Sequence, residues 1–140
     1  MAAFNKFNQF VADTQNGVHN IGSDTLKFML TNIAPVATNS VKADLTEIAA
    51  GNGYTAGGSQ VTISSSTQTG GTYSAVPAAD VVFTAAGGSI GPFRYVVLYN
   101  DTPTSPADPL ISYYDRGSEV TLNDTETFTI DVGATLYTLS

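Results

Sequence analysis

The stretch Ile90–Asp101, with the sequence IGPFRYVVLYND, decides the fold. Alternate residues of a strand share a face, and one face of this stretch carries four large side chains: Phe93, Tyr95, Val97 and Tyr99. The other face holds Val96 and Leu98, so both faces are largely apolar. Aromatic and β-branched residues favour a pleated, packed strand over the alternative, a short buried helix. Because Gly91-Pro92 and Asn100-Asp101 bound the run, it is predicted to be the central strand of a sandwich, covered on one face by a second sheet.

Composition restricts the classes of function. The chain has 140 residues, enough for one domain with a core, and no cysteine, so neither a disulfide nor a thiolate metal site is expected. Only 12% of residues are charged and the net charge is −7, which argues against binding to a nucleic-acid backbone. No apolar run approaches the roughly 20 residues of a membrane span, and residues 1–10 lack the pattern of a secretory signal.

Turn residues separate short alternating segments along the rest of the chain. Strands are expected over 25–32, 60–66, 79–84, 110–114, 119–122, 126–132 and 136–139. Loops are expected over 33–39, 51–58 and 102–109, and a helical turn or short strand over 42–50. Arg116-Gly117-Ser118 is an expected turn between two strands, and Ala86–Ser89 an expected hairpin link to the central strand.

Short strands at a spacing of about 8–12 residues predict the fold class. That class is all-β, an antiparallel β-sandwich or jelly-roll-like barrel, with less than about 15% helix. The predicted core comprises Phe83, Phe93 or Tyr95, Val97, Phe128 and Ile130.

Residues 1–22 are predicted to form an N-terminal arm, and residues 23–140 the β-sandwich domain. Four apolar residues recur in the arm among Asn, Gln and Thr: Phe4, Phe7, Phe10 and Val11. Their spacing allows a short amphipathic helix or an extended arm. Because three exposed aromatic rings would form a sticky patch, the arm is expected to dock on a neighbour or to fold back on the sandwich.

Burial of three phenylalanines contributes at most about 4–9 kcal/mol. Ordering the backbone costs roughly 1–2 kcal/mol per residue, so the two terms nearly cancel. We therefore hypothesise that the arm is mobile in the free protein, and that these four residues anchor it to a neighbouring chain, either a partner protein or a sister subunit.

Two glycine motifs match enzyme signatures but lack their context. Gly87–Gly91 (GGSIG) matches the GxSxG elbow of serine hydrolases, but that elbow needs a helix after Ser89, and here a strand follows. The triad of such enzymes places its histidine after the serine, whereas the single histidine, His19, precedes it. Gly51–Ala56 resembles a dinucleotide-binding loop, but two more glycines follow and no helix opens. Neither a catalytic residue nor a cofactor is predicted.

Metal and sugar sites find weak support in the sequence. Five aspartates lie in or beside loops, without the alternating spacing of a known calcium loop, and no metal is predicted: Asp101, Asp108, Asp115, Asp124 and Asp131. Tyr113-Tyr114 is a candidate sugar-stacking platform, but adjacent rings in a strand point to opposite faces. One of the two rings is therefore expected in the core.

Three stretches, in this order and spacing, resemble a family of small virion structural proteins of tailed bacteriophages. They are VHNIGSDTLKFMLTN (Val18–Asn32), ADLTEIAAGNGYTAGG (Ala43–Gly58) and DVVFTAAGGSIGPFRYVVLYND (Asp80–Asp101). Within that family the chain is most similar to capsid decoration, or cement, proteins.

The resemblance implies a non-enzymatic protein of the outer capsid surface, made in the host bacterial cytoplasm. It would stabilise the capsid by clamping neighbouring capsomers of the major capsid protein, as a homotrimer at threefold positions. The low surface charge agrees with contacts in an assembly. The alternatives are a head-fibre or tail component of the virion, or a carbohydrate-binding β-sandwich module.

Overall fold

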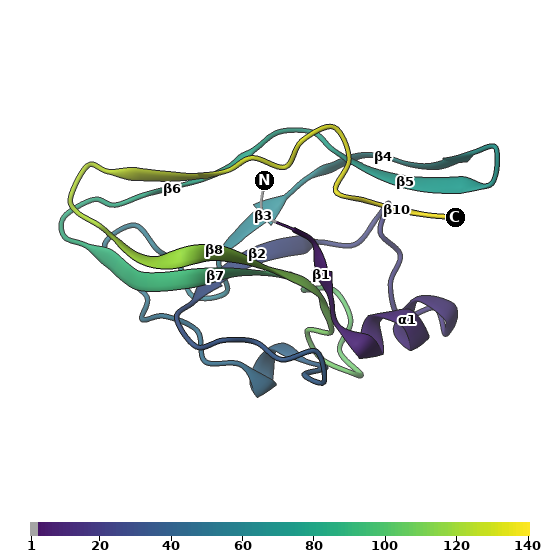
Figure 1. Ribbon diagram of the computed structural model, residues 1–140, viewed down its shortest axis with the longest axis horizontal. Helices are drawn as coiled ribbons and strands as arrows, with labels where there is room; N and C mark the ends of the chain where they lie inside the picture. The colour runs from purple at the N-terminus through teal and green to yellow at the C-terminus, as the bar shows by residue number, and fades with distance from the viewer. Residues whose placement is uncertain (1–2) are drawn as a thin grey trace.

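The computed structural model describes residues 3–140 and has two packed layers of antiparallel strands (Figure 1). One layer is a five-stranded sheet of order β1-β8-β7-β2-β3. The other consists of a three-stranded sheet, β10-β5-β4, beside a two-stranded sheet, β6-β9. The predicted all-β, sandwich-like architecture is therefore confirmed, without closure into a barrel.

The elements follow one another with these bounds: β1 Asn5–Lys6, α1 Asn8–Gln15, β2 Leu26–Thr31, the 3₁₀ turn η1 Lys42–Asp44, β3 Ser59–Val61, β4 Ile63–Thr69, β5 Thr72–Pro77, β6 Val81–Thr84, β7 Ile90–Asn100, β8 Leu110–Leu122, β9 Thr127–Ile130 and β10 Tyr137–Leu139. The helical content is low, as predicted. In the part of the chain that the structure describes, no helix is long and apolar enough to cross a bilayer.

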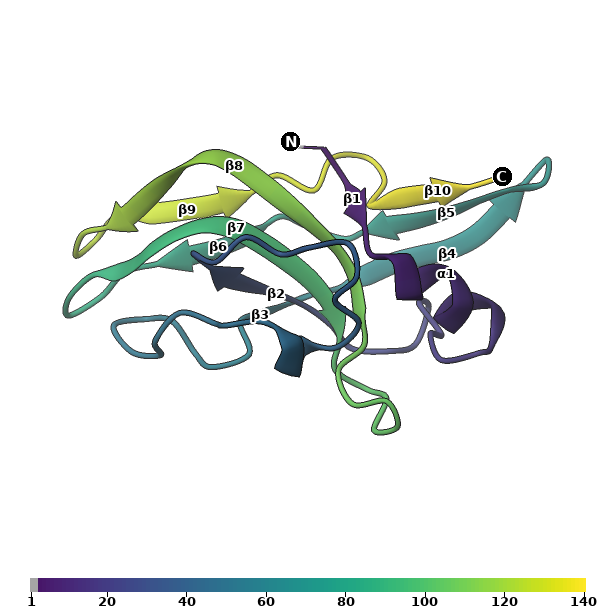
Figure 2. The same cartoon turned by 60° about the horizontal axis from the view of Figure 1, so that its bottom comes forward.

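Strand β7 is the central strand of the large sheet, between β8 and β2, as the sequence predicted. Its two faces belong to two separate apolar clusters, which explains why both faces are apolar. Val96 and Leu98 face the main core between the layers. Val97 and Tyr99 face a second cluster that contains Phe7, Met29 and Leu110. The loop before β3 runs over this second face (Figure 2). Phe7 and, from that loop, Leu45 pack in the cluster.

The predicted core residues are largely confirmed. Phe83, Phe93, Val97 and Ile130 are all buried. Phe128 is partly buried and packs edge-on against Phe93, with ring centroids 5.0 Å apart. Phe83, Phe93 and Ile130 lie in the main core and come from both layers, as a sandwich core requires, whereas Val97 is buried in the second cluster.

The predicted turn at Arg116-Gly117-Ser118 is wrong, because β8 runs through it without a break. Phe93 pairs with Val120 while Tyr95 pairs with Asp115, so residues 116–119 lie opposite the single residue 94. This irregularity is a bulge, and a glycine at φ 96° suits a bulge as well as a turn. The bulge also places Phe93 in the main core with Val96, and not on the face of Val97.

The chain crosses from one layer to the other at two places where the sequence predicted that it would stay within one sheet. The predicted strand 60–66 divides at Thr62, because β3 pairs with β2 and β4 pairs with β5. The predicted hairpin at Ala86–Ser89 is wrong, because β6 pairs with β9 and β7 pairs with β8. Buried Ala85 extends the β6–β9 ladder through backbone hydrogen bonds with Glu126 and Thr125, after which the chain bends into the other layer.

The N-terminal segment folds back on the sandwich, one of the two arrangements that the sequence allowed. Strand β1 is the edge of the large sheet, with Asn5 opposite Tyr113 on β8. The backbone N–H of Phe7 donates to the carbonyl of Ile111 (3.1 Å), and that of Asn8 to Ala37 (2.9 Å). Helix α1 then lies against the end of β8.

Candidate functional site

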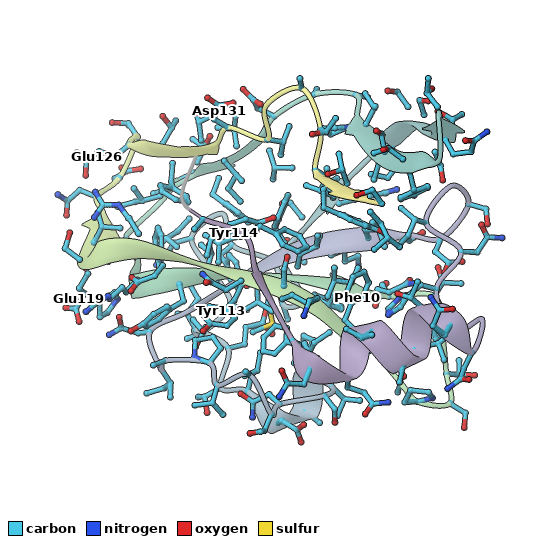
Figure 3. The ribbon with its side chains drawn as sticks, turned by 45° about the vertical axis from the view of Figure 1, so that its right-hand side comes forward. Phe10, Tyr113, Tyr114, Glu119, Glu126 and Asp131 are labelled. Carbon is cyan, nitrogen blue, oxygen red and sulfur yellow. The ribbon has the colours of Figure 1, made fainter. Side chains whose placement is uncertain are left out.

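A groove of about 330 Å³ separates α1 from the C-terminal strand β10. We call it the α1–β10 groove, and it is lined by Phe4, Lys6, Phe10, Val11, Thr14, Gln15, Tyr137, Thr138 and Leu139. Phe4 stacks on Tyr137 (centroids 5.6 Å apart, planes at 28°), and Phe10 meets the same ring edge-on (5.6 Å, 88°). Figure 3 labels Phe10 on α1, and the neighbouring strands of the large sheet lie beside it.

The rim of the α1–β10 groove exposes two aliphatic side chains. Val11 on α1 is 50% exposed and Leu139 on β10 is 51% exposed. Lys6 is the single charged residue of the lining. An apolar depression with apolar lips suits a side chain of another protein better than an ionic ligand.

The four arm residues predicted to contact a neighbour lie in different environments. Phe7 is fully buried and Phe10 is 6% exposed, both within this chain's own clusters. Phe4 is partly buried against the main core, and only Val11 is largely exposed. The pairing of β1 with β8 causes this, because it brings Phe7 onto Tyr113, with ring centroids 5.3 Å apart. A neighbour can therefore reach Val11, and part of Phe4, while the segment stays folded.

His19, the single histidine, makes contacts that join two segments of the fold. The Nδ1 atom of His19 lies 3.1 Å from Nδ2 of Asn100, and the same Nδ2 donates to Asp24 Oδ2 at 2.7 Å. Burial lowers the pKa of His19 below its ordinary 6.5, although Asp13 and Asp24 act in the opposite direction. His19 thus fastens the segment before β2 to the C-terminal end of β7, whereas Ser89 precedes the N-terminal end of that strand.

Neither glycine motif has the geometry of an active site. Ser89 is exposed in the turn before β7, and its carbonyl accepts a hydrogen bond from Asn52 Nδ2 (3.0 Å). A strand follows Ser89, so the helix of a nucleophile elbow is missing there. In the loop 51–58 no helix opens either, and Gly58, at φ +83°, brings the backbone against Phe28.

The glycine-rich loop 51–58 is fixed to the large sheet by a polar network around Glu47. Glu47 Oε2 accepts from the Tyr54 hydroxyl and from the Gly57 N–H, both at 2.6 Å, and Lys42 lies 3.2 Å from Oε1. The Tyr54 oxygen accepts from the N–H of Leu30 (3.0 Å). Burial, and then the Glu47 carboxylate, raise the pKa of Tyr54 well above its ordinary value. The network therefore fixes the loop against β2, and the Tyr54 ring packs into the main core beside Phe83.

The five aspartates considered for calcium do not form one cluster, although Asp101 and Asp108 are neighbours. Arg94 makes a bidentate ion pair with Asp115 (2.8 and 3.0 Å), which holds the pKa of that carboxyl below its usual range. Asp101 pairs with Lys27 at 3.0 Å, and burial beside Asp101 raises the pKa of Asp108. Asp124 and Asp131 accept hydrogen bonds from loop amides. Over residues 3–140, no three acidic, histidine or cysteine side chains form a metal-binding group, and Glu119, Glu126 and Asp131 lie apart in Figure 3.

Tyr113 and Tyr114 point to opposite faces of β8, as predicted (Figure 3). Tyr114 is buried in the main core, and this burial raises its pKa to about 12. Tyr113 packs against Phe7 on the other face. The two rings therefore form no coplanar platform for a sugar.

The α1–β10 groove was not predicted, because its two walls lie more than a hundred residues apart in the sequence. The Phe4, Phe10 and Val11 pattern indicated one wall, but Tyr137 and Leu139 gave no sign that they would face it. The chain matches no protein-family model, no curated protein and no solved structure.

Proposed function

We propose that this protein is a non-enzymatic structural protein of a tailed-bacteriophage virion. It decorates the outer surface of the capsid and stabilises it by clamping neighbouring capsomers. The observation that carries the proposal is the α1–β10 groove, an apolar contact surface with Val11 and Leu139 exposed on its rim. On a chain with 12% charged residues, such a surface suits a permanent assembly.

The resemblance to virion proteins falls on one structural unit, which supports the proposal. Two of its stretches contain β2 and β7, which pair from Leu26–Asn100 to Thr31–Tyr95. The remaining stretch, Ala43–Gly58, contains the loop that covers these strands, and the Tyr54 hydroxyl in it bonds to Leu30 of β2. Stretches scattered over the sequence thus form a single layered unit.

The proposed partner is the major capsid protein, and the proposed oligomer is a homotrimer at threefold positions. In this arrangement an apolar side chain of the capsid protein, or of a sister subunit, enters the α1–β10 groove. Val11 then makes the contact that the arm hypothesis gave to Phe4, Phe7, Phe10 and Val11 together.

The test is to purify particles of the phage that encodes the protein and to measure its copy number by quantitative mass spectrometry. We expect a copy number of the order of the capsomer count, and label on the head in immunogold images. Label on the tail or on head fibres, or absence from particles, would overturn the capsid assignment.

The groove itself is tested by adding the purified protein to capsids that lack it. Val11→Glu and Leu139→Glu are expected to weaken binding and to lower the temperature at which the capsid bursts. Val82→Glu is the matched control, because Val82 is 50% exposed on β6 and lies outside the groove lining. Equal binding by all three variants would remove the groove from the proposed function.

A further inference from the structure

Strand β4 has an unpaired edge on a projecting hairpin. It is the last strand of its sheet and pairs only with β5 among the described residues. Figures 1 and 2 show the β4–β5 hairpin reaching beyond the neighbouring elements. An edge of this kind presents backbone N–H and C=O groups that an added strand can pair with.

This edge lacks the protection that proteins usually give to exposed strands. Charged side chains, prolines and bulges normally prevent unwanted strand addition. The register of β4 shifts between Ile63 and Ser65, but residues 65–69 are Ser, Ser, Thr, Gln and Thr, with no charge and no proline. Residues 48–79 hold no Asp, Glu, Lys or Arg, although the chain as a whole has a net charge of −7.

We infer that β4 pairs with β4 of a second copy of this chain, antiparallel, about a twofold axis at Thr67. In this register Thr67 lies opposite its own copy, Ser65 opposite Thr69, and Ser66 opposite Gln68. Every cross-strand pair then joins two uncharged side chains with hydrogen-bonding groups, and Thr and Ser pairs of this kind stabilise sheets. The two three-stranded sheets become one continuous sheet.

Charge is the reason to choose a second copy as the partner. Two chains of net charge −7 repel each other, and they can approach most closely where neither carries a charge. The β4–β5 hairpin is such a place, and residues 66–69 are exposed on it. The side chains of β4 are also complementary to themselves, since hydroxyl and amide groups both donate and accept.

The proposed β4–β4 contact is small, so a dimer of the free protein is measurable only at high concentration. Five residues on each side bury far less than the roughly 1,600 Å² of a standard interface, so the free dimer is weak. Copies held side by side on a surface gain effective concentration, and the same contact then links them strongly. This twofold contact differs from a threefold one, and it does not depend on the proposed function.

The experiment is sedimentation velocity of the full chain from low micromolar to millimolar concentration. The wild-type chain is expected to form a dimer as concentration rises, and Thr67→Lys, which sets two like charges opposite each other, to weaken it at least about tenfold. Thr129→Lys is the matched control, since Thr129 is exposed on β9 and the substitution changes the net charge equally. This control is expected to dimerise like the wild type. Circular dichroism verifies that each variant is folded.

A complementary pair of variants tests the register. Thr67→Glu alone is expected to weaken the dimer as Thr67→Lys does, whereas an equimolar mixture of the two variants is expected to regain it, because opposite charges then face each other. A wild-type chain that stays monomeric at millimolar concentration overturns the inference. So does a Thr67→Lys chain that dimerises as tightly as Thr129→Lys, or a mixture that remains monomeric.

Discussion

Replacing Phe7 by alanine gives the most direct test of how the N-terminal segment is held. Phe7 is fully buried in the second cluster, with Met29, Val97, Tyr99 and Leu110. Phe7 is the residue that the described N-terminal segment contributes to this cluster. Removing the ring leaves a cavity in the second cluster, on the face of the large sheet that is turned away from the other layer.

The expected loss of unfolding free energy is about 3–5 kcal/mol, the usual cost of Phe→Ala in a core. Since a domain of this kind is stable by about 5–15 kcal/mol, the variant should fold but lose a large share of its stability. The melting temperature should fall by about 10 °C or more. Val11→Ala, four residues further on in α1 and 50% exposed, should change the stability by no more than about 0.5 kcal/mol.

Urea unfolding followed by tyrosine fluorescence measures both variants, and limited proteolysis reports on the segment itself. We expect the wild-type chain to resist cleavage near residue 20 and the Phe7→Ala chain to be cut there. A cost below about 1 kcal/mol for Phe7→Ala, equal to that of Val11→Ala, would refute the reasoning. The segment would then be detached in solution, and the original hypothesis of a free anchoring arm would apply.

Three further predictions concern the loops. Gly58→Ala should destabilise the chain by more than about 2 kcal/mol, because a Cβ at φ +83° would overlap the Phe28 carbonyl, whereas Gly70→Ala meets open space and should cost about 1 kcal/mol; urea unfolding compares them. His19 has a lowered folded pKa, so its contribution to stability should be complete above pH 6.5 and fall as the pH drops from 6.5 through the folded pKa; unfolding curves over pH 5–8 should show a steeper fall toward low pH in the wild type than in His19→Gln. Glu47→Gln should cost about 1–3 kcal/mol, because it weakens two charge-assisted hydrogen bonds, whereas exposed Glu119→Gln should cost less than about 0.5 kcal/mol; a melting temperature unchanged by Glu47→Gln would contradict the network.

Strand β7 could be predicted because its sequence satisfies several requirements at once. Apolar residues on both faces require burial on both sides, and Asn100-Asp101 marks where pairing stops. Gly91-Pro92 lies inside the strand, where the register shifts between Ile90 and Phe93. The loop 51–58 was predictable for a similar reason, since its four glycines all adopt positive φ. Local sequence determines these features, so they could be predicted without knowing how the rest of the chain folds.

Long-range pairing was not predictable in the same way. Gly117 at positive φ fits a turn or a bulge equally well, and only the pairing of Phe93 with Val120 shows that β8 continues. Thr62 has no special residue type to mark the change of layer, although β3 and β4 belong to different sheets. The segment that holds Phe7 was ambiguous for an energetic reason, because burial and ordering nearly cancel until the cavity that receives the ring is known.

The contact between Gly58 and Phe28 has a consequence for the ancestry of this fold. A Cβ at position 58 would meet main-chain atoms of Phe28, which no exchange of side chains can remove. Proteins that share an ancestor with this chain must therefore keep glycine at that place, or lose the way the loop crosses β2. Tyr54, by contrast, acts through its side chain, by hydroxyl bonds to Leu30 and Glu47 and by burial of its ring beside Phe83, and changes in neighbouring side chains can compensate for its replacement. Divergence should thus erase most of this sequence before it changes that glycine.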